Sequence, residues 1–326
     1  MSQDIILEID NLSLGFGKKT KVSKILDRVS FSIQKNERLA LVGESGCGKS
    51  ITAMSVMRLL KTPPAQYLGG SINFHGKDLL RMTSKQLQNI CGNKISMIFQ
   101  EPLTSLNPIM TIGGQVGEAL ILHNKYSKAE VHQKSIELLK SVRIPSPESR
   151  LKNYPGQYSG GMRQRVMIAM AIACHPEVLI ADEPTTALDV TIQAQILKLL
   201  KELQNEEEMS IILITHDLGV VAEFADRVVV MYAGQILEEA STKELFRNPL
   251  HPYTQGLLDS LPKVDSGKRK LKAIKGNVPT ANNMPNGCRF HPRCPHVMQI
   301  CIDSEPEMID KGDHKCKCFL ISKDGQ

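Results

Sequence analysis

The chain has 326 residues, of which 41% are apolar and 23% are charged, and its formal net charge is +6. These proportions are those of an ordinary globular protein, so they argue against disorder and fibrous repeats, and the length predicts about two domains. The excess of positive charge is mild, whereas a nucleic-acid groove needs a denser basic stripe. We therefore expect no nucleic-acid partner.

The chain itself is not expected to cross a membrane or to be exported. Its N-terminus lacks a basic segment followed by an apolar run, and no window of about 18 residues is uninterruptedly apolar. Without an export signal, the eight cysteines should lie in a reducing compartment, which disfavours disulfides.

Two kinds of strand are predicted. Residues 5–14 and 29–33 alternate between apolar and polar, which is typical of half-buried strands in an antiparallel sheet. Residues 39–42, 178–181 and 211–214 are continuous apolar runs, which suit parallel strands covered on both faces. Each of these runs precedes a polar turn and a helical pattern, so the fold class is α/β.

The remaining segments suggest where the domains divide. Residues 115–142 have helical periodicity, and residues 145–158 read as a loop because Pro, Ser and Gly are frequent there. After Pro249 the sequence becomes rich in Pro, Gly, Asn and Lys and leads into five closely spaced cysteines. We therefore expect one domain over residues 1–250 and a second over residues 251–326.

A phosphate-binding motif follows the predicted strand at residues 39–42 and precedes a helical segment that begins at Ile51. It reads Gly43-Glu44-Ser45-Gly46-Cys47-Gly48-Lys49-Ser50 and fits G-x-x-x-x-G-K-[ST] in the context that this motif requires. The glycines let backbone N–H groups surround a phosphate, and the helix N-terminus adds a favourable dipole. Lys49 would reach the β- and γ-phosphates of a nucleotide, and Ser50 would bind Mg²⁺.

Two carboxylates end the apolar run at residues 178–181. Asp182 is placed to join the Mg²⁺ shell, and Glu183 would stand beside the attacking water as a general base. Taken alone, an acidic strand exit has no special meaning. Together with the phosphate motif, it indicates nucleotide hydrolysis.

A second anion site is predicted where a long apolar helix begins. The segment reads Tyr158-Ser159-Gly160-Gly161-Met162-Arg163-Gln164-Arg165. A serine and two glycines at a helix start can bind an anion. With these three motifs the sequence resembles the ATP-binding cassette (ABC) ATPases, in which this signature, here Ser159, Gly160 and Gly161, contacts the γ-phosphate held by the partner subunit.

The resemblance extends over about residues 5–250 and implies further site residues. Phe16 matches the aromatic residue that stacks on adenine, and Gln100 matches the Q-loop residue that senses Mg²⁺ and faces the membrane subunits. Asp189, in Thr186-Ala187-Leu188-Asp189, resembles the D-loop residue at the dimer interface. His216 resembles the switch histidine that contacts the γ-phosphate. The implied fold is a P-loop NTPase with an antiparallel β subdomain, a parallel-sheet core and a helical subdomain at about residues 101–165.

Three positions depart from the family pattern. Tyr158 and Met162 replace the usual Leu and Gln of the signature, and Cys47 takes a place often held by Ser. None of the three removes a charge or a glycine, so the expectation of ATP hydrolysis stands.

Three longer motifs resemble the bacterial dipeptide, oligopeptide and nickel importers, and most closely the ATPases of dipeptide transporters. They are Glu101-Pro102-Leu103-Thr104-Ser105-Leu106-Asn107-Pro108, the signature above, and Asn248-Pro249-Leu250-His251-Pro252-Tyr253-Thr254. The resemblance implies a peripheral protein on the cytoplasmic face of the inner membrane. Its partners would be a paralogous ATPase or a second copy, two permeases and an extracytoplasmic substrate-binding protein. Nickel or another small solute is the alternative cargo, and a soluble ABC ATPase without a permease is the alternative class.

The cysteines near the C-terminus allow three interpretations. Zinc suits the ligand type, but its usual paired C-x(2–4)-C knuckles are absent. An iron–sulfur cluster needs four thiolates and tolerates irregular spacing, and unliganded thiols are the third possibility. This tail also resembles the C-terminal extension of the peptide-importer ATPases, some of which carry a [4Fe–4S] cluster. The resemblance implies Cys288, Cys294, Cys301 and Cys318 as ligands and leaves Cys316 as an extra, with a structural role expected for the cluster and redox sensing as the alternative.

Overall fold

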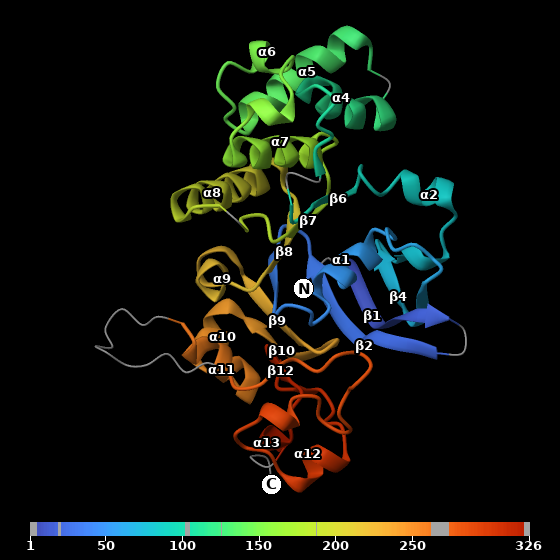
Figure 1. The fold of residues 1–326 in the computed structure, drawn as a ribbon, viewed down its shortest axis with the longest axis vertical. Coiled ribbons are helices and arrows are strands. Elements are labelled where there is room, and N and C mark those ends of the chain that lie inside the picture. Colours follow the sequence, from blue (N-terminus) through green and yellow to red (C-terminus); the bar gives the residue numbers. More distant parts are fainter. Residues whose placement is uncertain are drawn as a thin grey trace. The chain divides into compact units, whose positions relative to one another are not determined.

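The computed structural model describes residues 5–18, 21–101, 105–124, 126–186, 188–261 and 274–322. The chain divides into two compact units. The first unit comprises residues 1–6, 34–37 and 81–213, and the second comprises residues 7–33, 38–80 and 214–326. In Figure 1 the sequence runs from blue at the N-terminus to red at the C-terminus.

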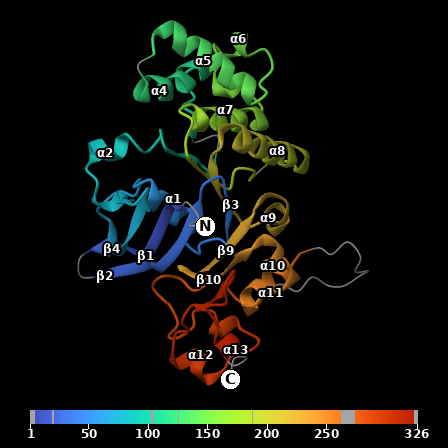
Figure 2. The ribbon, with the colours of Figure 1, turned by 180° about the vertical axis from the view of Figure 1, so that it is seen from behind.

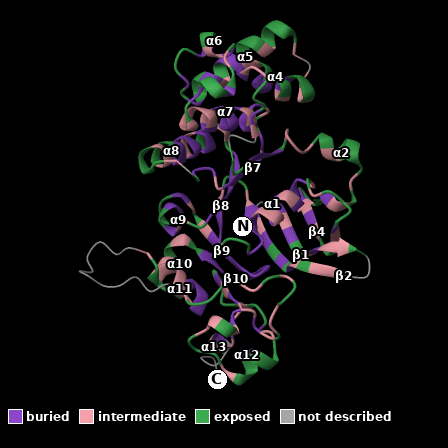
Figure 3. Cartoon of the chain, in the orientation of Figure 1, coloured by how far each residue is buried: buried purple, intermediate pink, exposed green. Residues whose placement is uncertain are grey.

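The first unit contains two of the buried strands and the larger part of a third. β6 (Ile95–Ile98) and β7 (Val178–Asp182) pair in parallel, and β8 (Ser210–Thr215) is the next neighbour of β7. Every residue of these three strands is buried, as Figure 3 shows for β7 and β8. The prediction of parallel strands covered on both faces is therefore confirmed for residues 178–181.

Helices make up the rest of this unit. α4, α5 and α7 contact one another and form the helical group in Figure 1. The six helices of the described part of this unit are α2 (Ser84–Gln88), α4 (Ile112–His123), α5 (Lys128–Ser141), α6 (Pro147–Arg150), α7 (Gly160–Ile172) and α8 (Val190–Glu207).

The prediction of helices over residues 115–142 is confirmed by α4 and α5, and capping chemistry explains the boundary between them. That stretch is two helices, because Ser127 and Glu130 form a capping box that starts a new helix, α5. The predicted loop at 145–158 also contains two short helical turns, α6 and a 3₁₀ turn over Pro155–Gln157. Both begin with a proline, whose fixed φ suits the first helical position.

The second unit contains an antiparallel sheet with the strand order β2-β1-β4-β5. Its strands, seen from behind in Figure 2, are β1 (Ile5–Lys18), β2 (Lys21–Gln34), β4 (Ala65–Phe74) and β5 (Lys77–Asp78). A bulge at Asn11 shifts the alternation of β1 by one residue. Leu7 and Ile9 are buried before the bulge, and Leu12 and Leu14 are buried after it. Gly70 lies opposite this bulge, where a Cβ would stand 2.5 Å from the Asn11 carbonyl.

A second group of strands carries the C-terminal part of the chain. β3 (Arg38–Val42) pairs in parallel with β9 (Arg227–Tyr232), and β10 (Gln235–Ser241) pairs antiparallel with β9. The C-terminal strand β12 (His314–Cys316) then pairs with β10, and β11 (Ile309–Asp310) pairs with β12. The residues after 250 thus extend a sheet that earlier residues begin.

The described helices of this unit are short. They are α1 (Lys49–Val56), α9 (Leu218–Phe224), α10 (Thr242–Arg247), α11 (Pro252–Asp259), α12 (Gln299–Asp303) and α13 (Phe319–Ser322). Residues 274–287 form no helix or strand. No helix in the described part of the chain is long and apolar enough to cross a membrane.

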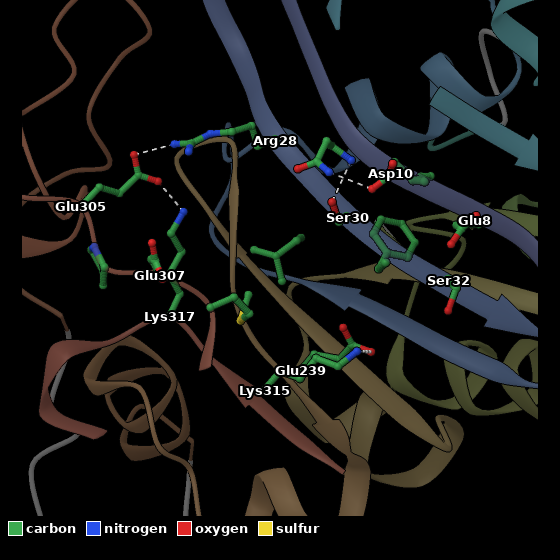
Figure 4. Close-up of a pocket in the computed structure, with 16 residues that line it drawn as sticks. Glu8, Asp10, Arg28, Ser30, Ser32, Glu239, Glu305, Glu307, Lys315 and Lys317 are labelled. Atoms are coloured by element: carbon green, nitrogen blue, oxygen red, sulfur yellow. Dashed lines mark hydrogen bonds and ion pairs between the residues drawn. The ribbon is translucent and has the colours of Figure 1, made fainter. Parts of the chain in front are cut away.

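Aromatic and ionic contacts attach the C-terminal segments to this unit. Tyr232, Tyr253 and Phe290 are each buried and pack ring to ring, with centroids 4.7 to 5.4 Å apart. Figure 4 shows a polar pocket of this unit, where Arg28 of β2 and Lys317 both bind Glu305. The Arg28 Nη2 atom lies 2.6 Å from the Glu305 carboxylate.

Candidate active site

The phosphate motif forms the turn between β3 and α1 in the second unit. Gly43 has φ +153°, and a Cβ there would stand 2.1 Å from the carbonyl oxygen of Met231, so only glycine fits. Gly48, the N-cap residue of α1, supplies no side-chain cap. No side chain at the N-cap therefore accepts a hydrogen bond from the first N–H groups of α1. These N–H groups can instead donate to an anion such as phosphate.

Lys49 bonds to the turn itself. Its ammonium group donates to the carbonyl oxygens of Gly43, at 2.7 Å, and of Glu44, at 3.1 Å, and the side chain is buried. To reach a phosphate, Lys49 must exchange these carbonyls for the phosphate oxygens. Cys47 is buried beside it, and burial raises the pKa of its thiol, so Cys47 lines the turn as a protonated, weakly reactive group.

Two other predicted nucleotide contacts belong to the same unit. Phe16 lies near the end of β1, half-buried, and its backbone pairs with Ala65 of β4. His216 is exposed and directly follows β8. Asp217 caps α9 by accepting hydrogen bonds from the backbone N–H groups of Gly219 and Val220, which fixes the turn that carries His216.

The carboxylates and the glutamine lie in the first unit. Asp182 is buried at the end of β7, and the next residue, Glu183, has a φ of +46°. Gln100 Nε2 donates to Glu183 Oε2 at 2.9 Å, and Thr186 Oγ1 donates to the same atom at 2.8 Å. A positive φ is uncommon for a residue other than glycine and is often found at functional sites. The structure therefore brings together Gln100 and Glu183, which are 83 residues apart.

The signature segment caps a helix of the first unit. Ser159 is exposed, and its hydroxyl accepts from the backbone N–H of Met162 at the start of α7. A Cβ on Gly161 would stand 2.9 Å from the Ile192 side chain, which explains the second glycine. The departure at Tyr158 is accommodated because its ring is buried and its hydroxyl donates to the Arg150 carbonyl at 3.0 Å.

Asp189 has a structural task besides its predicted D-loop role. Its carboxylate caps α8 by accepting from the backbone N–H of Ile192 at 2.9 Å. The neighbouring Ala187, and Pro102, Leu103 and Thr104 of the motif near Gln100, lie outside the described residues.

We expect Asp189→Ala to lower the free energy of unfolding by about 1 kcal/mol, because it leaves an N–H at the start of α8 without its cap. Asp189→Ser keeps a capping oxygen and should unfold at nearly the wild-type denaturant concentration. Urea unfolding of both variants separates this effect from a role at a dimer interface. Equal destabilisation of both variants would contradict the capping interpretation.

Four of the five C-terminal cysteines line one cavity in the second unit. Cys288, Cys294, Cys301 and Cys318 share it with aromatic and histidine side chains, whereas Cys316 does not line it. All four carry free thiols. Burial, and to a smaller extent the charges of the other three cysteines when ionised, raise the pKa of Cys318 to about 11. Burial also raises the pKa values of Cys288 and Cys294, so these two thiols and that of Cys318 would stay protonated unless a cation bound them.

Among the residues that the structure describes, no three His, Cys, Asp or Glu side chains are placed as ligands of one metal ion. The assignment of four iron–sulfur ligands stays a prediction.

Two residues that the sequence did not predict for the site contact the phosphate motif. The Tyr253 hydroxyl accepts from the backbone N–H of Glu44 at 2.8 Å, and Arg293 binds the Glu44 carboxylate. The motif from Asn248 to Thr254 contains Tyr253, but nothing in the motif indicates a contact with Glu44. Arg293 had no signal beyond its place next to Cys294.

A glycine-rich turn between a buried strand and a helix, and a second buried strand that ends at Asp182 and is followed by Glu183, are the features of a P-loop ATPase. Residues 26–186 match the family described as ABC transporter, and residues 237–301 match the family described as oligopeptide/dipeptide transporter, C-terminal region. The chain belongs to the ATP-binding proteins of oligopeptide and dipeptide ABC transporters, and it is an ATP-hydrolysing transporter subunit.

Relatives and solved structures agree with this assignment. The chain is 52% identical to the oligopeptide transport ATP-binding protein AppD of Bacillus subtilis over 98% of each chain. It is 51% identical to the dipeptide transport ATP-binding protein DppD of Haemophilus influenzae over 96% of this chain and 94% of the other. A dimeric, post-hydrolysis structure of the ATP-binding cassette MJ0796 bound to ADP and phosphate matches 72% of this chain and 98% of its own. Its TM-score is 0.65 at 27% identity.

Proposed function

We propose that this chain hydrolyses ATP to drive the import of dipeptides or oligopeptides through a membrane permease. The hydrolytic part rests on the contact between Gln100 and Glu183, because it holds a carboxylate at the end of a buried strand where a general base is needed. The peptide cargo is supported by the match of residues 237–301 to the C-terminal region of peptide transporters.

The residues of the phosphate motif, from Gly43 to Ser50, and Ile51 would bind ATP, with Phe16 on the adenine. Ser50, Gln100 and Asp182 would hold Mg²⁺, Glu183 would activate the attacking water, and His216 would contact the γ-phosphate. Ser159, Gly160, Gly161 and Asp189 would act across a dimer, on the ATP of a partner. Its partner would be a paralogous ATPase or a second copy.

The membrane partners would be two permeases, with an extracytoplasmic substrate-binding protein delivering the cargo. The chain would then bind peripherally, on the cytoplasmic face of the inner membrane. We also propose residues 1–250 as the ATPase domain, with a helical subdomain at about 101–165, and residues 251–326 as the peptide-importer region.

A nickel or small-solute importer of the same family would share these ATPase residues, and a soluble ABC ATPase would need no permease. Co-purification from detergent extracts distinguishes the classes. Association with two membrane proteins supports an importer, and ribonuclease-sensitive association with nucleic acid would contradict it. Transport of labelled dipeptide by the assembled complex, without transport of nickel, would support the peptide cargo.

We further propose that Cys288, Cys294, Cys301 and Cys318 hold a [4Fe–4S] cluster, with zinc as the alternative. The support is that these four thiols line one cavity and Cys316 does not. A bound cluster would supply four metal–thiolate bonds, which stabilise a loop-rich segment that has few apolar residues to bury.

Protein purified without oxygen should contain about four irons and four acid-labile sulfides per chain, with a brown colour. Cys294→Ala should lose most of the iron. Cys174→Ala is the matched control, because Cys174 does not line this cavity, and it should keep the iron. One zinc per chain and no iron would overturn the cluster and leave the ATPase assignment in place.

A further inference from the structure

Glu44, inside the phosphate motif, forms hydrogen bonds through its N–H, its carboxylate and its carbonyl oxygen. Its N–H donates to the Tyr253 hydroxyl at 2.8 Å, and its carboxylate oxygens accept from Arg293 Nη1 at 3.1 and 3.0 Å. Its carbonyl oxygen accepts from Lys49 Nζ at 3.1 Å and from the Cys47 N–H at 3.3 Å. Glu44 therefore supplies one of the two carbonyls, together with that of Gly43, that hold Lys49 before a nucleotide binds.

Arg293 is itself held firmly. Its side chain is only 5% exposed. Its Nε donates to the carbonyl of Lys275 at 2.9 Å, its Nη2 to that of Ile274 at 3.4 Å, and its Nη1 reaches the Tyr232 hydroxyl at 3.4 Å. A planar guanidinium with this many partners has one orientation. Arg293 therefore forms a rigid connection between the segment next to Cys294 and Glu44.

Tyr253 is equally constrained. Its ring is fully buried between Tyr232 and Phe290, with centroids 4.7 and 5.4 Å away. Its backbone N–H donates to His251 Nδ1 at 3.0 Å, which fixes the first turn of α11. The hydroxyl thus cannot move away from Glu44 without displacing the aromatic core of the C-terminal region.

We propose that Tyr253 and Arg293 are positioning residues of the nucleotide site, through which the C-terminal region sets the conformation of the phosphate-binding turn. Neither residue would touch the nucleotide. Both act through Glu44, which in turn places one of the two carbonyls that hold Lys49. The proposal rests on the proposed assignment of residues 43–51 to ATP.

The test measures nucleotide binding rather than turnover, by calorimetric titration of the full chain with Mg²⁺ and ATP. Tyr253→Phe keeps the packed ring and removes only the hydroxyl, and Arg293→Gln removes the ion pair with Glu44. Each should raise the Kd for ATP about three- to tenfold, the effect of losing one hydrogen bond to a constrained group. Arg28→Gln is the matched control, because it breaks an ion pair of the same region that does not touch the turn, and it should leave the Kd unchanged.

A double-mutant cycle separates positioning from general loss of stability. Arg293→Gln should have little further effect on the Kd in a Glu44→Gln background, since the carboxylate it acts through is gone. Equal effects of Arg293→Gln in both backgrounds, or wild-type affinity in Tyr253→Phe and Arg293→Gln, would overturn the proposal. Lys49→Ala tests the underlying site separately, because undiminished ATP binding in that variant would contradict the proposed nucleotide site itself.

Discussion

Glu183→Gln should reduce ATP hydrolysis by about 10²- to 10⁴-fold and leave ATP binding intact. The substitution preserves the shape of the side chain but replaces the carboxylate oxygen that accepts from Gln100 and Thr186 by a group that cannot take a proton from water. Phosphate release by the assembled complex measures the loss, and titration with ATP shows that binding remains.

Glu206→Gln is the matched control for this experiment. Glu206 is an exposed carboxylate on α8, so its neutralisation should leave turnover unchanged. Wild-type hydrolysis by Glu183→Gln in a correctly assembled complex would contradict the role of Glu183 as the base. Loss of ATP binding in that variant would instead show that the carboxylate supports the nucleotide site.

Ser159→Arg should block turnover at the ATP site of the partner subunit. Ser159 is exposed at the start of α7, where the N–H groups of the helix favour an anion. A long cationic side chain would occupy the place proposed for the γ-phosphate of the partner's ATP. The measurement pairs the variant with a wild-type partner and records the phosphate released per complex.

The loss of the helix cap needs its own control, because Ser159 also accepts from the Met162 N–H. Ser127→Arg removes an equivalent cap at the start of α5 and should cost a similar amount, about 1 kcal/mol of unfolding free energy. It should leave turnover unchanged. If the Ser159→Arg subunit pairs normally and its partner's site hydrolyses at the full rate, the signature assignment is wrong.

Local sequence was sufficient for the strands and the phosphate-binding turn. The apolar runs at 39–42, 178–181 and 211–214 are buried strands, because a strand covered on both faces must be apolar at every position. Gly43 and Gly48 adopt positive φ angles that other residues avoid, so the glycines of the motif predict this backbone conformation. Such features depend on neighbours in the chain, so the sequence alone determined them.

Contacts between distant segments depended on the tertiary structure. The hydrogen bond from Gln100 to Glu183 and the ion pair between Glu44 and Arg293 join residues 83 and 249 positions apart. No periodicity in the sequence predicts such pairs. They depend on the path of the whole backbone and on how the side chains of the core pack together. The same holds for the four cysteines, because only the fold places Cys288, Cys294, Cys301 and Cys318 around one cavity. The sequence thus determined the ATPase class, while the tertiary structure decided which C-terminal residues reach the phosphate-binding turn.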